Sequence, residues 1–152
     1  MKEVIKAFYT ALNNHDVDTM VSYYHDEIIF EDPIFGKLEG DKAKKMWYWL
    51  CENGKDLTVK FSDIKVNHDK GSAYWEARYT FGGRKRPVLN RVTSTFEFKD
   101  RKIIKHTDNY SLHRWSSQAM GWKGRVIGGS SYFRKKIQYR SNRLLDKFNI
   151  DA

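Results

Sequence analysis

The chain has 152 residues, 40% of them hydrophobic and 31% charged, a composition that excludes a disordered segment and fits one domain with its own core. The net charge is +9, of which residues 114–152 contribute +7, so any acidic partner concerns the tail first. No stretch approaches the ~18 apolar residues that span a bilayer, and residues 1–12 lack the apolar region of a signal peptide. The single Cys51 excludes an internal disulfide and fits a reducing compartment, so we expect a cytoplasmic protein.

Apolar residues in the first third of the chain recur at helical spacing. They predict helices over 2–13, 17–24 and 42–53, with Asp16 and Asp41 as caps of the second and third. Residues 28–32 between them read as a short strand that ends at Pro33, which has no N–H to pair. A short return strand is expected over 35–40.

From residue 57 onward the apolar residues alternate, which is typical of β-strands. We expect strands over 57–66, 73–81, 88–98 and 102–113, with a β-bulge near Ser62 and Asp63 where the parity changes. Helices followed by long antiparallel strands predict an α+β fold, with the helices packed on one side of a curved sheet.

Several of these segments resemble the nuclear transport factor 2 and ketosteroid isomerase superfamily. The resemblance rests on residues 8–13 (FYTALN), 16–18 (DVD) and 30–33 (FEDP), with Gly40. The tail, with residues 114–121 (RWSSQAMG), a Gly-rich loop and a basic helix, resembles SnoaL-like bacterial members. The resemblance implies a cone-shaped α+β barrel, a pocket between the inner sheet face and the helices, and a homodimer.

The resemblance also implies roles for single residues. Asp32 matches the general-base aspartate of ketosteroid isomerase, and Asp108 stands where SnoaL-like cyclases place an acid on the final strand. The two oxyanion donors of the isomerase are replaced here by Phe8 and Ser94. Because such donors contribute much of the rate enhancement, steroid isomerisation is not expected.

The residues themselves support an acid/base pair in an apolar pocket. Asp32 and Asp108 share their strand faces with apolar side chains, so burial should raise their pKa values, and His106 lies on the same face as Asp108. The structural alternatives are a turn cap for Asp32, a backbone or arginine contact for Asp108, and a sheet-edge hydrogen bond for His106. The expected ligand-binding residues are Phe8, Trp47, Trp75, Tyr79, Ser94, Phe96 and Tyr110. No metal-ligand spacing or phosphate loop appears, so we expect no metal and no cofactor.

The tail reads as a loop followed by a basic amphipathic helix over 131–149. We divide the chain into a domain over 1–115 and an extension over 116–152 that packs on the domain or on its dimer mate. Phe133, Ile137, Leu144 and Phe148 are expected to be buried. Binding to an anionic membrane surface is the less favoured alternative, and no motif for specific nucleic-acid recognition appears.

Two functions stay open at this point. One is a cofactor-free isomerase, cyclase or epoxide hydrolase that acts on an apolar ligand through Asp32 and Asp108. The other is a ligand-binding or protein-interaction module that keeps the fold without the chemistry. The retained carboxyls favour the first, whereas the missing oxyanion donors favour the second.

Overall fold

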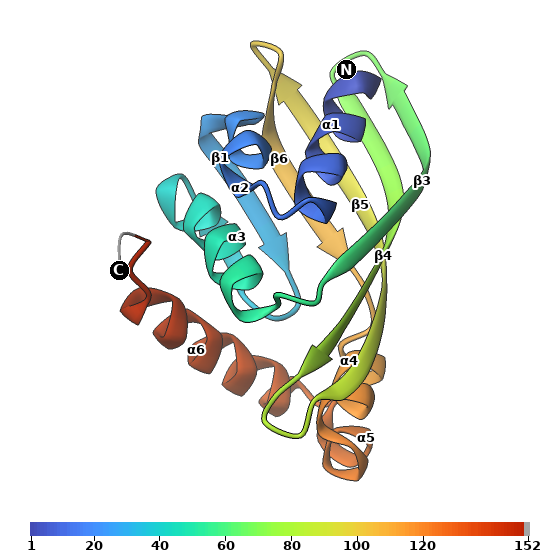
Figure 1. Cartoon of the computed structure of the whole chain (residues 1–152), viewed down its shortest axis with the longest axis vertical. Helices are drawn as coiled ribbons and strands as arrows, with labels where there is room; N and C mark the ends of the chain where they lie inside the picture. The colour runs from blue at the N-terminus through green and yellow to red at the C-terminus, as the bar shows by residue number, and fades with distance from the viewer. Residues whose placement is uncertain (151–152) are drawn as a thin grey trace.

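The computed structural model describes residues 1–150 as six helices and six strands (Figure 1). In chain order they are α1 (Lys2–Asn13), α2 (Val17–Ser22), β1 (Tyr24–Asp32), β2 (Gly36–Glu39), α3 (Asp41–Asn53), β3 (Thr58–Asn67), β4 (Lys70–Phe81), β5 (Arg86–Lys99), β6 (Lys102–Asn109), α4 (Leu112–Met120), α5 (Trp122–Ile127) and α6 (Ser131–Lys147). No helix within residues 1–150 has both the length and the apolar character needed to cross a membrane.

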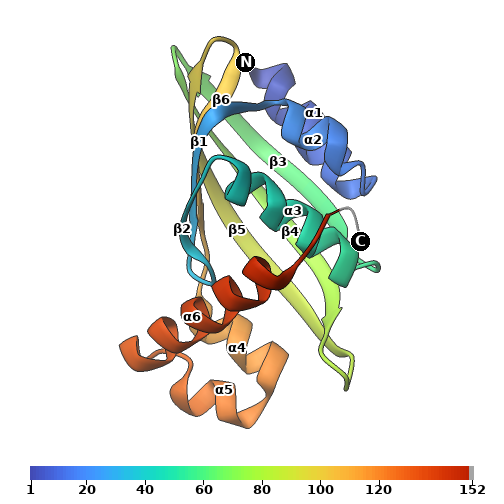
Figure 2. The same cartoon turned by 90° about the vertical axis from the view of Figure 1, so that its left-hand side faces the viewer.

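The strands form one bent sheet in the order β2-β1-β6-β5-β4-β3. Every neighbouring pair is antiparallel except β1 and β6, which run parallel. The sheet curves around α1, α2 and α3, which lie together on one of its faces (Figure 2). The predicted α+β cone is therefore confirmed, with one correction: β2 and β3 are edge strands, so the sheet is open and not a closed barrel.

The core lies between this sheet face and the first three helices. In α1 the buried residues Ile5, Phe8 and Leu12 recur at helical spacing and face the sheet. The second helix begins as expected, because Asp16 accepts a hydrogen bond from the Thr19 amide at 3.2 Å. It ends earlier than expected, at Ser22, and Tyr24 is the first residue of β1.

The bulge in β3 lies where the change of parity predicts it. The register against β4 shifts between Ser62 and Lys65, and Asp63 has a φ of +54°. This extra residue bends the edge strand and helps the sheet to curve over the helices.

Residues 112–127 differ from the expectation, because they form two helices in place of a strand end and a loop. Ser111 caps α4 by accepting a hydrogen bond from the Arg114 amide at 3.1 Å. Leu112, Trp115 and Ala119 then bury one face of α4 in a second apolar cluster. The expected domain boundary at residue 115 thus falls inside a helix, and the division of the chain stays a proposal.

The last helix, α6, packs beside α3 at the wide end of the cone (Figures 1 and 2). Phe133 and Leu145 are buried, Ile137 and Phe148 are half-buried, and Leu144 is exposed. The expected burial of Leu144 is therefore wrong, because the helix turns its neighbour Leu145 inward. The side-chain amide of Asn142 also donates a hydrogen bond to the Phe35 carbonyl oxygen at 2.8 Å, which ties α6 to the turn after β1.

Candidate functional site

Asp32 lies at the last position of β1, directly before the turn that leads into β2. Its Oδ1 accepts hydrogen bonds from the amides of Ile34 at 3.0 Å and Phe35 at 2.7 Å. Its Oδ2 accepts a hydrogen bond from the Tyr110 hydroxyl at 3.1 Å. Because β1 and β6 are parallel, their carboxyl ends reach the same edge, and Tyr110 arrives there one residue after β6.

The half-buried carboxyl of Asp32 has a strongly shifted pKa. Burial raises the pKa from 3.8 to about 7, and the charge of Asp108 raises it as well. The hydrogen bonds from Phe35, Tyr110 and Ile34 act in the opposite direction because they stabilise the carboxylate. Among residues 1–150 no Lys or Arg forms an ion pair with Asp32. Asp32 therefore exchanges a proton near neutral pH.

Asp108, His106 and Ser94 form a buried polar group in the middle of the sheet. His106 Nε2 lies 2.7 Å from Asp108 Oδ1, and the Ser94 hydroxyl donates to the same oxygen. Ser94 and Asp108 are cross-strand partners in β5 and β6, which explains their contact. His106 is not at a sheet edge, because β6 lies between β1 and β5.

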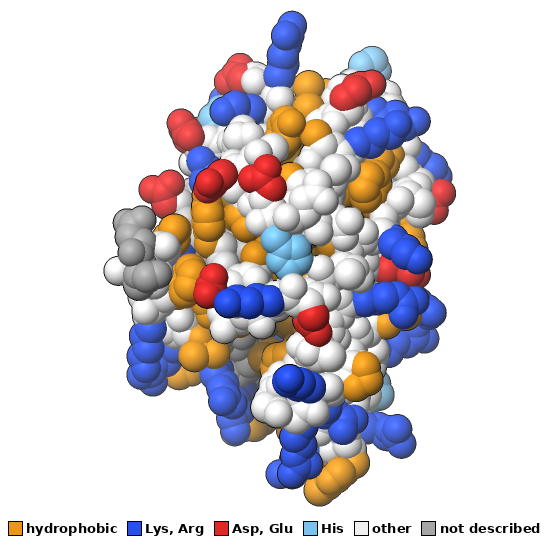
Figure 3. All heavy atoms as spheres, viewed as in Figure 1, with side chains coloured by type: hydrophobic (Ala, Val, Ile, Leu, Met, Phe, Trp, Pro, Cys, Tyr) orange, Lys and Arg blue, Asp and Glu red, His pale blue; other side chains and the backbone are white. Residues whose placement is uncertain are grey.

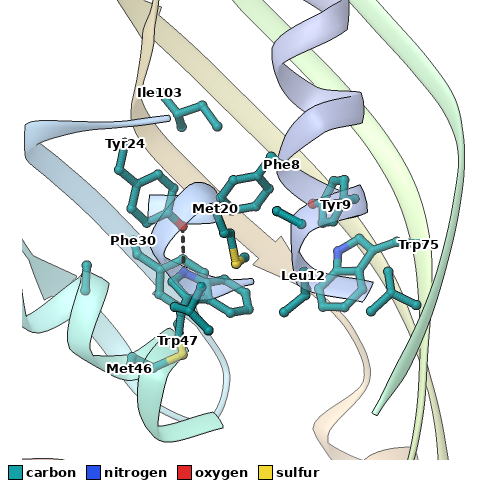
Figure 4. Close-up of a cluster of buried hydrophobic side chains, with 14 of the residues drawn as sticks. Phe8, Tyr9, Leu12, Met20, Tyr24, Phe30, Met46, Trp47, Trp75 and Ile103 are labelled. Atoms are coloured by element: carbon teal, nitrogen blue, oxygen red, sulfur yellow. Dashed lines mark hydrogen bonds between the residues drawn. The ribbon is translucent and has the colours of Figure 1, made fainter. Parts of the chain in front are cut away.

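Two tyrosines and two tryptophans extend this group into a larger network. Tyr9 and Trp75 donate to the Ser94 hydroxyl at 2.7 Å and 2.8 Å. On the other side, Tyr24 lies 2.7 Å from His106 Nδ1, and Trp47 donates to the Tyr24 oxygen at 2.9 Å (Figure 4). Every donor finds an acceptor when His106 carries its proton on Nε2 and Tyr24 donates to Nδ1.

The tyrosines of both groups are held as neutral hydroxyls. Burial, followed by the charge of Asp108, raises the pKa values of Tyr9 and Tyr24 well above the usual value of 10. Burial, followed by the charge of Asp32, does the same to the pKa of Tyr110. These side chains therefore act as hydrogen-bond donors throughout the neutral range.

The sequence-predicted site residues separate into two groups. Phe8, Trp47, Trp75, Ser94, Phe96, His106 and Asp108 are buried within the core. Tyr79, Tyr110 and Asp32 are half-buried and lie toward the C-terminal extension. Tyr79 accepts a hydrogen bond from Trp115 Nε1 at 2.7 Å, which brings α4 against this second group. Phe8 packs its ring 5.3 Å from the Tyr24 ring and 5.5 Å from the His106 ring.

Two surface hollows lie beside the extension. The larger, of about 370 Å³, is lined by residues of β3, β4 and β5 together with Gln118, and Tyr79 forms part of its wall. The smaller, of about 270 Å³, lies between β5 and α4. Neither hollow is lined by Asp32 or Asp108. Within residues 1–150 no three His, Cys, Asp or Glu side chains gather as metal ligands would.

Sequence reasoning missed Tyr9, Tyr24 and Trp115. Tyr9 follows Ile5 by four positions, which places it on the buried face of α1, and that spacing was a usable signal. Helical spacing does not place Tyr24, because α2 ends at Ser22 and β1 begins at Tyr24. Trp115 lies in a segment that continues the strand alternation as far as Leu112, which conceals the start of α4.

Comparisons with known proteins agree with the fold described above. The family model described as a SnoaL-like domain matches residues 5–106. A protein of Catenulispora acidiphila with a ketosteroid isomerase-like fold, in complex with trimethylamine, superposes with a TM-score of 0.69 at 13% identity, covering 78% of this chain and 92% of that one. No curated protein matches the sequence.

Two further solved structures carry functional descriptions. SalBIII, an epoxide hydrolase/cyclase-like enzyme of pyran ring formation in salinomycin, has a TM-score of 0.66 at 18% identity, with 74% of this chain and 92% of that chain covered. TerC, co-crystallised with polyporic acid, has a TM-score of 0.62 at 15% identity, with coverage of 71% and 88%. At these identities the similarity establishes the fold alone.

Proposed function

Because this chain belongs to the SnoaL-like family, within the nuclear transport factor 2-like superfamily, we propose that it binds a small apolar ligand beside Asp32 and transfers a proton through that carboxyl. The observation that carries the proposal is a half-buried carboxyl at a strand end that is held by Tyr110 and has no cationic partner within residues 1–150; its burial raises the pKa to about 7. A general acid or base works best when its pKa lies near the working pH.

The neighbours of Asp32 suit this role. Tyr110 donates to Oδ2 and fixes the plane of the carboxyl. Tyr79 accepts the Trp115 N–H, so its own hydrogen is left to donate to a ligand oxygen. Burial raises the pKa of Tyr79 to about 12, which keeps that hydrogen in place at neutral pH. In this arrangement Asp32 moves the proton while Tyr79 binds the developing negative charge.

The buried network has a positioning role in this proposal. His106 and Asp108 are at most 3% exposed, so they do not reach a ligand at the surface. The charge of Asp108 nonetheless raises the pKa of Asp32. Phe8, Trp47, Trp75, Ser94 and Phe96 are buried residues that pack against or belong to this network. The structurally similar proteins that were co-crystallised with polyporic acid or take part in pyran ring formation support a ring compound as the ligand.

A deuterium-exchange experiment tests the proposal. A panel of flat fused-ring ketones is first screened for compounds that raise the melting temperature, and binders are then incubated with the protein in D₂O. Asp32→Asn should keep binding and slow deuterium uptake at carbon by roughly 10²–10⁴-fold, the usual contribution of one acid/base group. Glu31→Gln, which removes the exposed neighbouring carboxylate of the same strand, should leave the uptake unchanged.

A non-catalytic binding module is the second candidate. It is favoured by the two turn amides that bind Oδ1, since this is also how an aspartate caps a turn. In that case ligands bind but exchange no hydrogen, and Asp32→Asn alters neither property. An NMR titration that places the pKa of Asp32 near or below 3.8 would also exclude the acid/base role.

A further inference from the structure

We propose that the outward face of α5 and α6 binds the surface of an anionic lipid bilayer. This face consists of Trp122, Lys123, Arg125 and Val126 of α5 with Tyr132, Lys136, Tyr139 and Arg143 of α6. The proposal is independent of the chemistry at Asp32, because none of these residues contributes to that site.

The charged residues of positions 112–145 are all basic, and Asp146, the acidic residue of α6, forms an ion pair with Lys42. Residues 112–145 contain eight Lys and Arg residues and no Asp or Glu: Arg114, Lys123, Arg125, Arg134, Lys135, Lys136, Arg140 and Arg143. In Figure 3 the lower end of the molecule, where α5 lies in Figure 1, shows blue and orange side chains without red ones between them. Such a surface attracts anionic lipid headgroups, at about 1 kcal/mol per basic residue near the membrane.

The same region exposes large apolar side chains. Trp122 is 71% exposed and Val126 is 72% exposed, and their spacing of four residues places them on the same side of α5. Ile127, the last residue of this helix, is also exposed. Apolar groups next to a ring of cations are the pattern of helices that lie in a membrane interface.

The helix α6 repeats this pattern on its outward side. Phe133 and Leu145 face the protein, whereas Tyr132 and Tyr139 are 73% and 66% exposed and lie about two turns apart on the opposite side. Lys136 lies 6.0 Å from the Tyr132 ring centre, and Arg143 lies 5.8 Å from the Tyr139 ring centre. Tyrosine and tryptophan rings with cations beside them are typical of side chains that lie at the level of the lipid headgroups.

Charge and side-chain type favour a membrane over two other partners, a second copy of the chain and nucleic acid. A second copy would place the same eight cations opposite each other, and the acidic residue of α6, Asp146, is already paired with Lys42 of its own chain. Nucleic acid would bind the cations through its phosphates and the tyrosines through its bases, but it would not bury the exposed aliphatic side chains of Val126 and Ile127. A bilayer interface accepts the cations, the aromatic rings and the aliphatic groups together.

Vesicle flotation with the full chain tests the proposal. Wild-type protein should float with vesicles of mixed phosphatidylcholine and phosphatidylglycerol, and should not float with phosphatidylcholine alone. Replacing two cations, in Lys123→Gln/Lys136→Gln, should weaken vesicle affinity by roughly 30-fold, since each contributes a factor of about five. The matched control Lys60→Gln/Lys65→Gln removes two exposed cations from β3 and should bind as wild type.

Tryptophan fluorescence adds a readout that does not depend on charge. Trp122 is the exposed tryptophan, so the emission should shift to the blue with anionic vesicles, and the shift should be absent in Trp122→Phe, which still floats. Equal binding to both vesicle types, loss of binding in the β3 control, or unchanged binding of the Lys123/Lys136 variant overturns the proposal. Binding to a DNA duplex without binding to vesicles overturns the proposal in favour of nucleic acid. A dimer that shields Trp122 overturns it in favour of a second copy of the chain.

Discussion

At the residue scale, the carboxyls of Asp32 and Asp108 differ in what surrounds them. Asp108 contacts a histidine and a serine deep in the sheet, whereas Asp32 is held by two turn amides and one tyrosine at the end of a strand. Strand parity predicted that both face inward. It did not reveal the hydrogen bond of His106 with Tyr24 or that of Ser94 with Tyr9, because these partners lie 82 and 85 residues away in the sequence.

The shifted pKa of Asp32 predicts a specific dependence of stability on pH. The folded protein holds this proton up to about pH 7, whereas the unfolded chain releases it near 3.8, so the free energy of unfolding falls as the pH rises between these values. Asp32→Asn retains the turn hydrogen bonds and lacks the charge. Urea denaturation at pH 5 and pH 8 should show a decline that is about 2 kcal/mol larger for the wild type than for the variant, after allowance for partial solvent contact.

Glu31→Gln is the control for that comparison. Because it removes an exposed carboxylate, its stability should decline between pH 5 and pH 8 as much as that of the wild type. If the wild type and Asp32→Asn lose stability in parallel between pH 5 and pH 8, the carboxyl of Asp32 is ionised throughout that range.

At the element scale, two glycines, one in α5 and one directly after it, allow α5 to approach α4 very closely. A Cβ on Gly124 would overlap the carbonyl oxygen of Ser116, and one on Gly128 would overlap the Ser116 hydroxyl. The Ser116 hydroxyl donates to the Gly124 carbonyl oxygen at 3.2 Å, so the two helices are also hydrogen-bonded there. These glycines read as loop residues in the sequence, because glycine lowers helix propensity and nothing local indicates a helix crossing.

Gly124→Ala should therefore destabilise the protein although alanine favours helices. We expect a loss of about 2 kcal/mol in the free energy of unfolding, typical of an overpacked site. Gly83→Ala is the matched control, because no atom lies near its added methyl group and its φ is not positive. A Gly124→Ala variant as stable as the control in thermal melting would mean that α5 does not pack closely against α4.

At the scale of the whole molecule, one deeply buried side chain near the end of α6 helps to tie the extension to the cone. Leu145 is 0% exposed and belongs to the main core, while its neighbour Leu144 is 46% exposed. Periodicity predicted the helix almost to its ends and placed both leucines near one face, but the set expected to be buried named Leu144 and not Leu145. The cause is physical: with few apolar residues in α6, the inward face is set by where the helix meets α3 and the turn after β1, which local sequence does not encode.

The two leucines make a matched pair of variants. Leu145→Ala should lower the free energy of unfolding by roughly 2–5 kcal/mol, the range for truncating a buried leucine. Leu144→Ala should change it by no more than about 0.5 kcal/mol, as is usual at exposed positions. Urea denaturation measures both, and equal effects would contradict the docking of α6 described above.

The parallel pairing of β1 with β6 also constrains how the chain folds during synthesis. Phe30 lies beside His106, so one edge of β1 has no partner until the ribosome has made the residues of β6, about 70 positions later in the sequence. Pairings between distant segments form slowly, and an open strand edge can pair with the wrong chain meanwhile. A nascent chain that already carries α1, α2 and the β1–β2 hairpin is thus at its most aggregation-prone just before β6 emerges. The strand that is made last, β6, is the one that fills the centre of the sheet.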